Sequence, residues 1–369
     1  MQADFGTIAK REPRRTADWW FFGATLALVM VGLMAINSVD QATGQHNAAK
    51  QGMFAALGIG VWFVFRKIPL SLWQWAANGL YVLNLGLLSS VLLFGHVVKG
   101  AKRWILVGSF QFQPSDLTMI LVVLTLAAFF ARRTEETGSW KTYGLSFLHV
   151  LPSVFLLLLQ PHYGRAACVL AIWLVMALYA GVPWKTIGAS IACLLALVGF
   201  ALFTPGLFKG YHMDRISELF NKVVHGTSDT QGTGWQAAQS VKAISMGGLV
   251  GTGYGRGEQK AGRFIPEQHN DFVFSVIGEE LGLIGSLLVL AVFLTFFFRM
   301  WYLGYNTRDP MRRLVTGGLL AFLSFHTVVN LSMVLNIGPV IGLWLPFVSN
   351  GGTALMTCMA AVGLADQPN

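Results

Sequence analysis

The feature that most constrains this chain is a succession of apolar stretches, each about as long as a helix that crosses a bilayer. A transmembrane helix needs about 20 mostly apolar residues. The composition agrees, because 54% of the residues are hydrophobic, only 12% are charged and the mean hydropathy is +0.57. The apolar stretches lie at 19–37, 51–66, 74–97, 115–131, 143–160, 164–181, 184–203, 272–298, 315–336 and 342–363. The sequence therefore predicts an all-α polytopic membrane protein with about ten transmembrane helices and one large loop before the eighth.

The positions of the 26 Lys and Arg residues predict how these spans are oriented. Cytoplasmic loops carry an excess of basic residues close to the spans. With the N-terminus inside, 14 of the 26 fall on the cytoplasmic side and seven in the long outer loop 204–270. The other five are Lys50, Lys99, Lys102, Arg103 and Arg165, which this threading places in short outer loops. Both termini are therefore predicted to be cytoplasmic.

No repeat with a period of about 20 to 50 residues and no low-complexity linker divides the chain. Residues 1–369 are thus predicted to form a single membrane domain, with a cytoplasmic tail at 1–18 and a large extracytoplasmic loop at 204–270. Loops of that length are usually functional or disordered. Within it, Met213 to Val224 carries an apolar stripe. The stripe fits either a helix resting on the membrane surface or an ordinary helix packed on the bundle.

The membrane architecture also explains the charge and the cysteines. The net charge of +9 comes from basic residues spread over helix ends, not gathered on one soluble face, so a nucleic-acid partner is not expected. The three cysteines, Cys168, Cys193 and Cys358, lie in apolar stretches without CxxC spacing. They are predicted to be small core residues, neither disulfides nor metal ligands.

Asp271 is the first candidate for a functional residue. It stands where the long outer loop enters an apolar span, and a carboxylate there is costly unless something nearby needs it. Glu279 and Glu280 follow after about two helical turns, so Asp271 and Glu279 are predicted to share a helix face about 12 Å apart. The plain alternative for Asp271 is a helix cap. Capping does not explain the two glutamates, which lie deeper and are expected to face a cavity or another helix.

A second cluster contains Lys99, Lys102 and Arg103, which are cations on an outer loop. They run against the charge rule, so they indicate either an anion such as phosphate or anchoring at lipid headgroups beside Trp104. A little further on, Pro114 is well placed to begin a helix, with Asp116 complementing the dipole in its first turn.

The last apolar stretch contains Pro346, Gly351 and Gly352. A proline and a glycine pair in one span predict a broken helix that frees backbone polar groups, which is tolerated only against protein or a wet cavity. Close packing of small residues is the alternative. His162, His326 and Asn330 complete the intramembrane polar residues, and the histidines are interpreted as buried and not as metal ligands.

Taken together, these motifs resemble the SEDS family of RodA, FtsW and SpoVE, and the Phe-Gln-Pro-Ser form is closest to the RodA type. The resemblance runs in order from about Lys99 to the C-terminus. The matching blocks are Lys99–Trp104, Phe112–Asp116, Gln160-Pro161, Gln239-Ser240, Gly247–Leu249 with Gly251, Ile265–Glu267, Asn270–Phe274, Gly278–Gly282, Leu345-Pro346, and Ser349 with Gly351-Gly352.

The resemblance implies a peptidoglycan glycosyltransferase that polymerises lipid II at the outer face of the bacterial cytoplasmic (inner) membrane, in cell elongation and shape control. Asp271 matches the family's essential aspartate and would act as general base in an inverting transfer. Residues expected to contact the substrate are Lys99, Lys102, Arg103, Lys242, Arg263, Glu267 and Ser349. A supporting polar network would comprise Asp116, Glu279, Glu280, His162, Gly351 and Gly352. A divalent cation (Mg or Mn) could assist, and a class B penicillin-binding protein would supply the transpeptidase.

The chain departs from the family pattern at several positions. Met119 stands where the family usually has Lys, and Gln160-Pro161-His162-Tyr163-Gly164-Arg165 replaces the usual Gln-Pro-Asp-Leu-Gly-Thr. Loss of a lysine together with an aspartate is interpreted as compensatory, because losing one member alone would strand a buried charge.

Two other functions stay open at this point. Broken helices and intramembrane polar residues also suit a transporter or flippase for the same lipid-linked precursor. The changes at Met119 and His162 raise a catalytically impaired scaffold of the cell-wall machinery as a further alternative.

Overall fold

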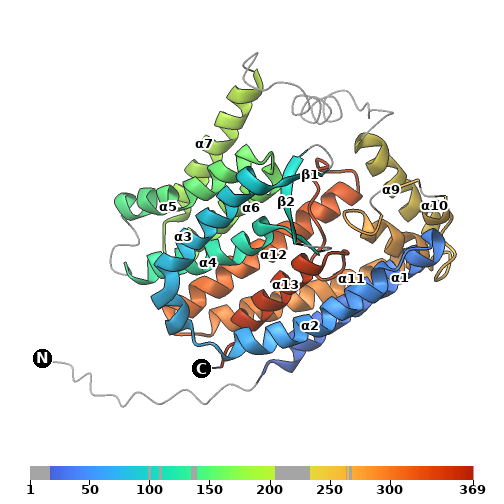
Figure 1. Cartoon of the computed structure of the whole chain (residues 1–369), viewed down its shortest axis with the longest axis horizontal. Coiled ribbons are helices and arrows are strands. Elements are labelled where there is room, and N and C mark those ends of the chain that lie inside the picture. Colours follow the sequence, from blue (N-terminus) through green and yellow to red (C-terminus); the bar gives the residue numbers. More distant parts are fainter. Residues whose placement is uncertain are drawn as a thin grey trace, which may run out of the picture.

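The computed structural model describes residues 17–98, 101–107, 110–133, 139–203, 233–262, 264–265 and 268–368. These residues form a bundle of helices with one small sheet at its edge (Figure 1). The helices are α1 (Trp19–Thr43), α2 (Asn47–Lys67), α3 (Leu70–Phe94), α4 (Pro114–Ala131), α5 (Trp140–Leu159), α6 (Tyr163–Tyr179), α7 (Trp184–Phe203), α9 (Thr233–Gly247), α10 (Glu258–Ala261), α11 (Val273–Tyr305), α12 (Pro310–Val334) and α13 (Gly352–Ala365). The strands are β1 (His96–Val98), β2 (Ala101–Val107) and β3 (Phe110–Phe112).

The prediction of a polytopic helical membrane protein is confirmed. Seven of the described helices, α1 to α5, α11 and α12, are long and apolar enough to cross a membrane. Helices α6 and α13 are shorter and also apolar. The last predicted stretch, 342–363, is helical only from Gly352 onward, so the break predicted from Pro346 and the glycine pair leaves its first part without helix.

Helix boundaries follow local chemistry. The carboxylate of Asp18 accepts a hydrogen bond from the Phe21 amide at the start of α1, and Gly44 ends that helix in the left-handed region at φ 71°. Helix α4 begins at Pro114, as predicted, because proline has no amide hydrogen to leave unpaired in a first turn. Asp309 caps α12 in the same way as Asp18 caps α1.

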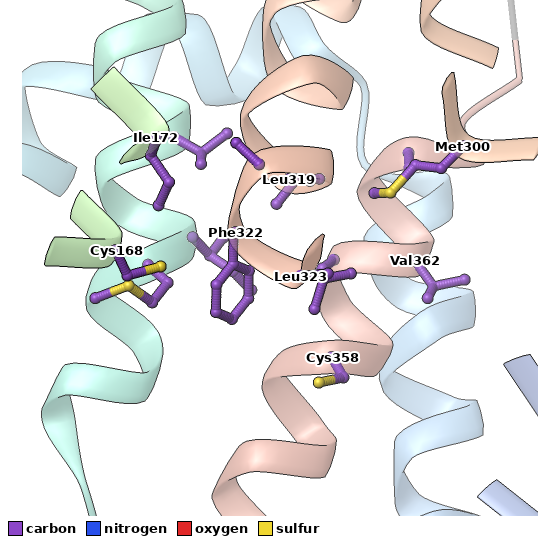
Figure 2. Close-up of a cluster of buried hydrophobic side chains, with 14 of the residues drawn as sticks. Cys168, Ile172, Met300, Leu319, Phe322, Leu323, Cys358 and Val362 are labelled. Atoms are coloured by element: carbon purple, nitrogen blue, oxygen red, sulfur yellow. The ribbon is translucent and has the colours of Figure 1, made fainter. Parts of the chain in front are cut away.

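The core lies around α4, the most buried of the seven long spans. Helices α3, α6 and α12 pack against it, and α13 packs along α2. Figure 2 shows Cys168 and Ile172 facing Phe322, with Leu323 and Cys358 beyond it. Cys168 and Cys358 are buried core residues, as predicted, whereas Cys193 on α7 is exposed, which corrects its assignment.

The connection between α3 and α4 is a small antiparallel sheet, where only a loop was predicted. Strand β2 lies between β1 and β3, with Ile105 opposite Phe112. The sheet carries Lys102 and Arg103 on β2 and leads directly into Pro114. The sheet therefore fixes the positions of these two cations at the edge of the bundle.

The second half of the predicted outer loop 204–270 is also structured. Residues Thr233–Gly247 form α9, which packs along α11, and the Ser240 hydroxyl donates a 2.8 Å hydrogen bond to the carbonyl of Val334. The predicted helix at 213–224 lies outside the described residues. Part of the predicted outer loop therefore packs against the bundle.

Helix α11 is interrupted at Gly282, and the turn after α9 fills the gap. Gly282 has φ 65° and ψ −164°, a conformation that side chains other than glycine's disfavour. Leu283 and Ile284 amides donate to the carbonyls of Gly248 and Leu249, at 2.9 and 3.1 Å. In return, the carbonyls of Glu279 and Glu280 accept from the turn at 252–253. The motifs at 247–251 and 278–282 therefore contact each other through backbone hydrogen bonds, and we call this contact the joint at Gly282.

The first and the last described residues of the chain meet on one side of the bundle. The amide of Asp18 donates a 3.0 Å hydrogen bond to the Asp366 carboxylate, which also pairs with Arg66 at 3.0 Å. The Asp18 carboxylate pairs in turn with Arg299 on α11. The prediction that both termini lie on the same side is consistent with this contact.

Candidate functional site

Asp271 lies in a turn at one end of the bundle, two residues before α11. The helix begins at Val273, and its N-cap, Phe272, makes no side-chain cap bond. The N-cap position of α11 is thus Phe272, one residue after Asp271. Its side chain is only partly buried, and Oδ2 lies 3.3 Å from where a Cβ on Gly342 would stand. Gly342 has φ 66°, so glycine at this position lets the backbone turn beside the carboxylate.

The turn that carries Asp271 is tied to the non-helical segment 342–351 by hydrogen bonds. Asn330 on α12 donates from Nδ2 to the carbonyls of both Asp271 and Leu343, at 2.7 and 2.6 Å. The Asn350 amide donates to the carbonyl of His269 at 2.9 Å. Because Asn330 is fully buried, this bridge holds the two segments in register without help from solvent.

Ser349 belongs to the same bridge. Its hydroxyl donates to the Asn270 carbonyl at 2.6 Å and accepts from the Leu345 amide at 2.7 Å. The residue is 5% exposed. Both hydrogen-bonding directions are used inside the protein, so Ser349 is a strut and not the substrate contact that was predicted.

A third support comes from α2, where sequence reasoning saw nothing polar of interest. The Gln51 amide group donates to the Ser349 carbonyl and accepts from the Gly351 amide, at 3.2 and 3.1 Å. Gly351 is the N-cap of α13 and Gly352 its first residue. A Cβ on Gly352 would overlap the Phe54 ring, so its small size permits α2 to approach, in agreement with a structural role for this glycine pair.

Asp116, in the first turn of α4, is the centre of a buried network. Its carboxylate forms an ion pair with Arg165 on α6 and accepts from Trp344 Nε1 at 3.2 Å and from Thr353 Oγ1 at 2.8 Å. The prediction that Asp116 belongs to a polar network is consistent with these contacts. Arg165, however, was assigned to an outer loop, and that assignment is wrong because its side chain is 2% exposed.

The two predicted intramembrane histidines, His162 and His326, lie beside this network. His162 Nε2 lies 3.4 Å from the Gln113 side-chain nitrogen, and His326 Nδ1 lies 3.4 Å from the carbonyl of Trp344. Both side chains are buried. The interpretation of both as buried histidines agrees with this placement.

Glu279 and Glu280 hold a different part of the molecule. Glu279 accepts from the amides of Gln259 and Lys260, at 2.7 and 3.4 Å, at the start of α10. Glu280 pairs with the Lys260 ammonium and accepts from the Ser38 hydroxyl on α1. Both glutamates therefore face other helices, as expected, and they hold the loop helix α10 on α1 and α11.

The predicted substrate-binding cations are spread over several elements. Lys102 on β2 and Lys242 on α9 are exposed, while the guanidinium of Arg103 donates to the carbonyls of Gln160 and Pro161. Lys99, Arg263 and Glu267 lie outside the described residues. Among these cations, Lys102 and Lys242 are exposed in the described part of the chain, and Arg103 is half-buried.

Several network residues were missed by sequence reasoning. Arg165 and Lys260 were counted as loop cations, and no signal marked Gln51, Ser38 or Trp344. A basic residue beside an apolar stretch indicates a membrane boundary, so only tertiary structure separates a buried partner from a loop cation. Among the described residues, no three His, Cys, Asp or Glu side chains stand together as a metal site.

Fold and site together define a multi-pass membrane protein with a half-buried carboxylate held in a rigid turn at one end of the bundle. The family model described as cell cycle protein, which covers FtsW, RodA and SpoVE, matches residues 16–367. This chain belongs to that family.

Relatives from both branches match along most of the chain. The peptidoglycan glycosyltransferase MrdB of Escherichia coli K12 is 32% identical, over 92% of this chain and 91% of its own length. The probable peptidoglycan glycosyltransferase FtsW of Halorhodospira halophila is 34% identical, over 97% and 92%.

Solved structures agree in fold. A chain of a peptidoglycan synthase complex, described as coordinating polymerization and crosslinking, has a TM-score of 0.80 at 29% identity, over 95% of this chain and 96% of its own. The rod shape determining protein RodA of Thermus thermophilus has a TM-score of 0.68 at 27% identity, over the same shares.

Proposed function

We propose that this chain is a peptidoglycan glycosyltransferase that polymerises lipid II, with Asp271 as the general base. The class of activity follows from family membership and from relatives named for it along nearly the full chain. One observation carries the assignment of the base. Asp271 is a partly exposed carboxylate on a turn whose backbone is fixed by Asn330 and the 342–351 segment. Such rigidity suits a group that must meet a substrate in one geometry.

The chemistry needs one proton transfer and one substitution. The 4-hydroxyl of the acceptor sugar gives its proton to the Asp271 carboxylate as its oxygen attacks the anomeric carbon of the donor. The bond from that carbon to the lipid diphosphate breaks, and undecaprenyl diphosphate leaves with the electron pair. Attack opposite an α-linked diphosphate inverts the centre and gives a β(1→4) link.

The leaving diphosphate needs positive charge near it. Lys102 and Lys242 are exposed and available for this task, and Lys99 and Arg263 are further candidates by sequence. Should a divalent cation assist, it would supply more positive charge to the leaving diphosphate, and Asp271 is the described carboxylate of this site that would help to hold it. The proposal therefore includes a requirement of polymerisation for a divalent cation, which the activity assay measures.

Sidedness and partner complete the proposal. The basic residues near the spans favour cytoplasmic termini, which places Asp271 at the outer face of the bacterial cytoplasmic membrane. The partner is a class B penicillin-binding protein that crosslinks the strands made here, and the role is in cell elongation. Support comes from the synthase complex whose chain this fold matches.

The test is polymer formation from lipid II by the purified chain in vesicles, read as glycan strands on a gel. We expect Asp271→Asn to lower turnover by about 10²- to 10⁴-fold, the usual contribution of a positioned general base. Glu258→Gln is the matched control, because it makes the same carboxyl-to-amide change at an exposed position on α10. Unchanged polymerisation by Asp271→Asn would refute the base assignment. Translocation of lipid II without polymer would favour the transporter instead.

A further inference from the structure

Among the described residues, Arg165 is the largest of the fully buried side chains, and it lies where α6, α4 and the segment 342–351 meet. From the first turn of α6 its guanidinium pairs with Asp116 on α4 and donates to the Ser115 carbonyl at 3.1 Å. It also lies 3.5 Å from the Gln113 side-chain oxygen and stands over the Trp344 ring, 5.4 Å from the centroid. A buried arginine with this many partners has one geometry available to it.

Trp344 is held from several sides by this cluster. Its indole N–H donates to Asp116, its carbonyl lies 3.4 Å from His326 Nδ1, and the His326 ring contacts its own ring at 4.3 Å. Phe322, which Figure 2 shows in the core, meets the same ring edge-on. The indole can therefore shift only if the Asp116–Arg165 pair shifts as well.

Trp344 stands directly beside the groups that place Asp271. Its neighbour Leu343 shares the Asn330 amide with Asp271, and Gly342 is the residue on which the Asp271 carboxylate rests. At the other end of the segment, Thr353 donates to the second oxygen of Asp116. One carboxylate thus anchors both sides of the segment that supports the proposed base.

We propose that Arg165 is a positioning residue for glycosyl transfer: its ion pair holds the Asp116 carboxylate against Trp344 and Thr353, and thereby fixes the segment beside Asp271. This inference rests on the proposed function of Asp271. It also revises the interpretation of the family departures. The cation expected at position 119 on α4 is not lost, because α6 supplies one at position 165 to the same carboxylate.

Position 119 on α4 offers a second place for the cation that pairs with Asp116. Met119 is fully buried, three residues after Asp116 on the same helix, and residues three apart are neighbours on a helix surface. A lysine at 119 would lie on the same face of α4 as Asp116, within reach of its carboxylate. Arg165→Thr with Met119→Lys therefore keeps the carboxylate and changes only the source of its partner.

A second double variant removes the pair altogether. Asp116→Leu with Arg165→Met replaces both charges with apolar side chains of similar size, a change that buried pairs commonly tolerate without loss of stability. Trp344 and Thr353 then lose their acceptor. This variant separates the need for a stable fold from the need for an oriented segment.

The experiment measures kcat and KM for lipid II polymerisation by the full chain in vesicles, with thermal unfolding in detergent as the folding readout. Asp271→Asn and the unchanged chain are assayed in parallel. If the unchanged chain makes no polymer, the proposed function fails. If it makes polymer, the Arg165 variants test positioning alone.

We expect the apolar pair to unfold at a temperature close to that of the unchanged chain but to lose at least about 10-fold in kcat, with KM changed less than about 3-fold. The relocated cation should recover kcat to within about 3-fold. A folded apolar pair with unchanged kcat would overturn the proposal, because Arg165 would then serve stability alone. A folded relocated-cation variant without activity would overturn it too. Should the apolar pair fail to fold, the relocated-cation variant decides the matter by the same criterion.

Discussion

Two of the ion pairs in the described part of the chain are fully buried, and they hold different elements. Asp116 and Arg165 join α4 to α6 and hold a non-helical segment beside Asp271. Glu280 and Lys260 join α11 to α10, with Ser38 of α1 as a third member, and hold a loop helix on the bundle. Burial and charge are alike in both. What differs is the element each pair immobilises, so equal stabilisation need not mean equal effect on chemistry.

The largest effect should come from leaving either carboxylate without its cation. We expect Arg165→Met and Lys260→Met each to lower the free energy of unfolding by about 3 to 5 kcal/mol, because each strands a buried charge. Denaturant titration in detergent measures this. Under conditions where both variants are folded, kcat should fall further for Arg165→Met. A larger loss of kcat in Lys260→Met would reverse the comparison.

The next effect concerns the joint beside the second pair. Gly282→Ala should destabilise the protein by about 3 kcal/mol, from a left-handed backbone cost of about 1 to 2 and weakening of the hydrogen bonds to the 248–249 turn at about 1 each. A Cβ there would also overlap the Gly251 amide. Gly86→Ala is the control, since its Cβ meets nothing within 4 Å. Equal melting temperatures for the two variants would contradict this account.

Smaller effects should follow removal of one neutral donor from each pair. Thr353→Val and Ser38→Ala each delete a hydroxyl that donates to a buried carboxylate, a contact worth about 1.5 to 3 kcal/mol. We expect similar losses of stability for both, measured by thermal unfolding. Only Thr353→Val should also lower kcat, by a few-fold, because Thr353 adjoins the segment that supports Asp271. Equal kcat in the two variants would count against the difference in role.

The smallest effect is expected at an exposed carboxylate of the same loop helix. Glu258→Gln should change the free energy of unfolding by less than about 0.5 kcal/mol, because surface substitutions away from such networks have little effect. The same titration detects it. A loss comparable to that of Lys260→Met would show that the hold on α10 does not depend on the buried pair.

The spans and the break before α13 were predictable, because hydropathy and the positions of proline and glycine are local properties of the sequence, whereas the role of Asp271 stays a prediction. The buried cations that pair with Asp116 and Glu280 were not predictable. Arg165 is 49 residues from Asp116 and Lys260 is 20 from Glu280, and both stand where basic residues usually mark a membrane boundary. Ser349 was misjudged for a related reason, since a serine in a motif gives no sign of whether its hydroxyl faces the substrate or the backbone.

The joint at Gly282 has a consequence for engineering. Residues 248–253 and 279–284 complete one another's backbone hydrogen bonds, so the two segments form one structural unit although about 30 residues separate them in the sequence. A chimera that takes the segment from α9 to α10 out of a relative should carry that relative's 278–284 with it. Swapping either half alone would place two mismatched surfaces in the middle of a membrane helix.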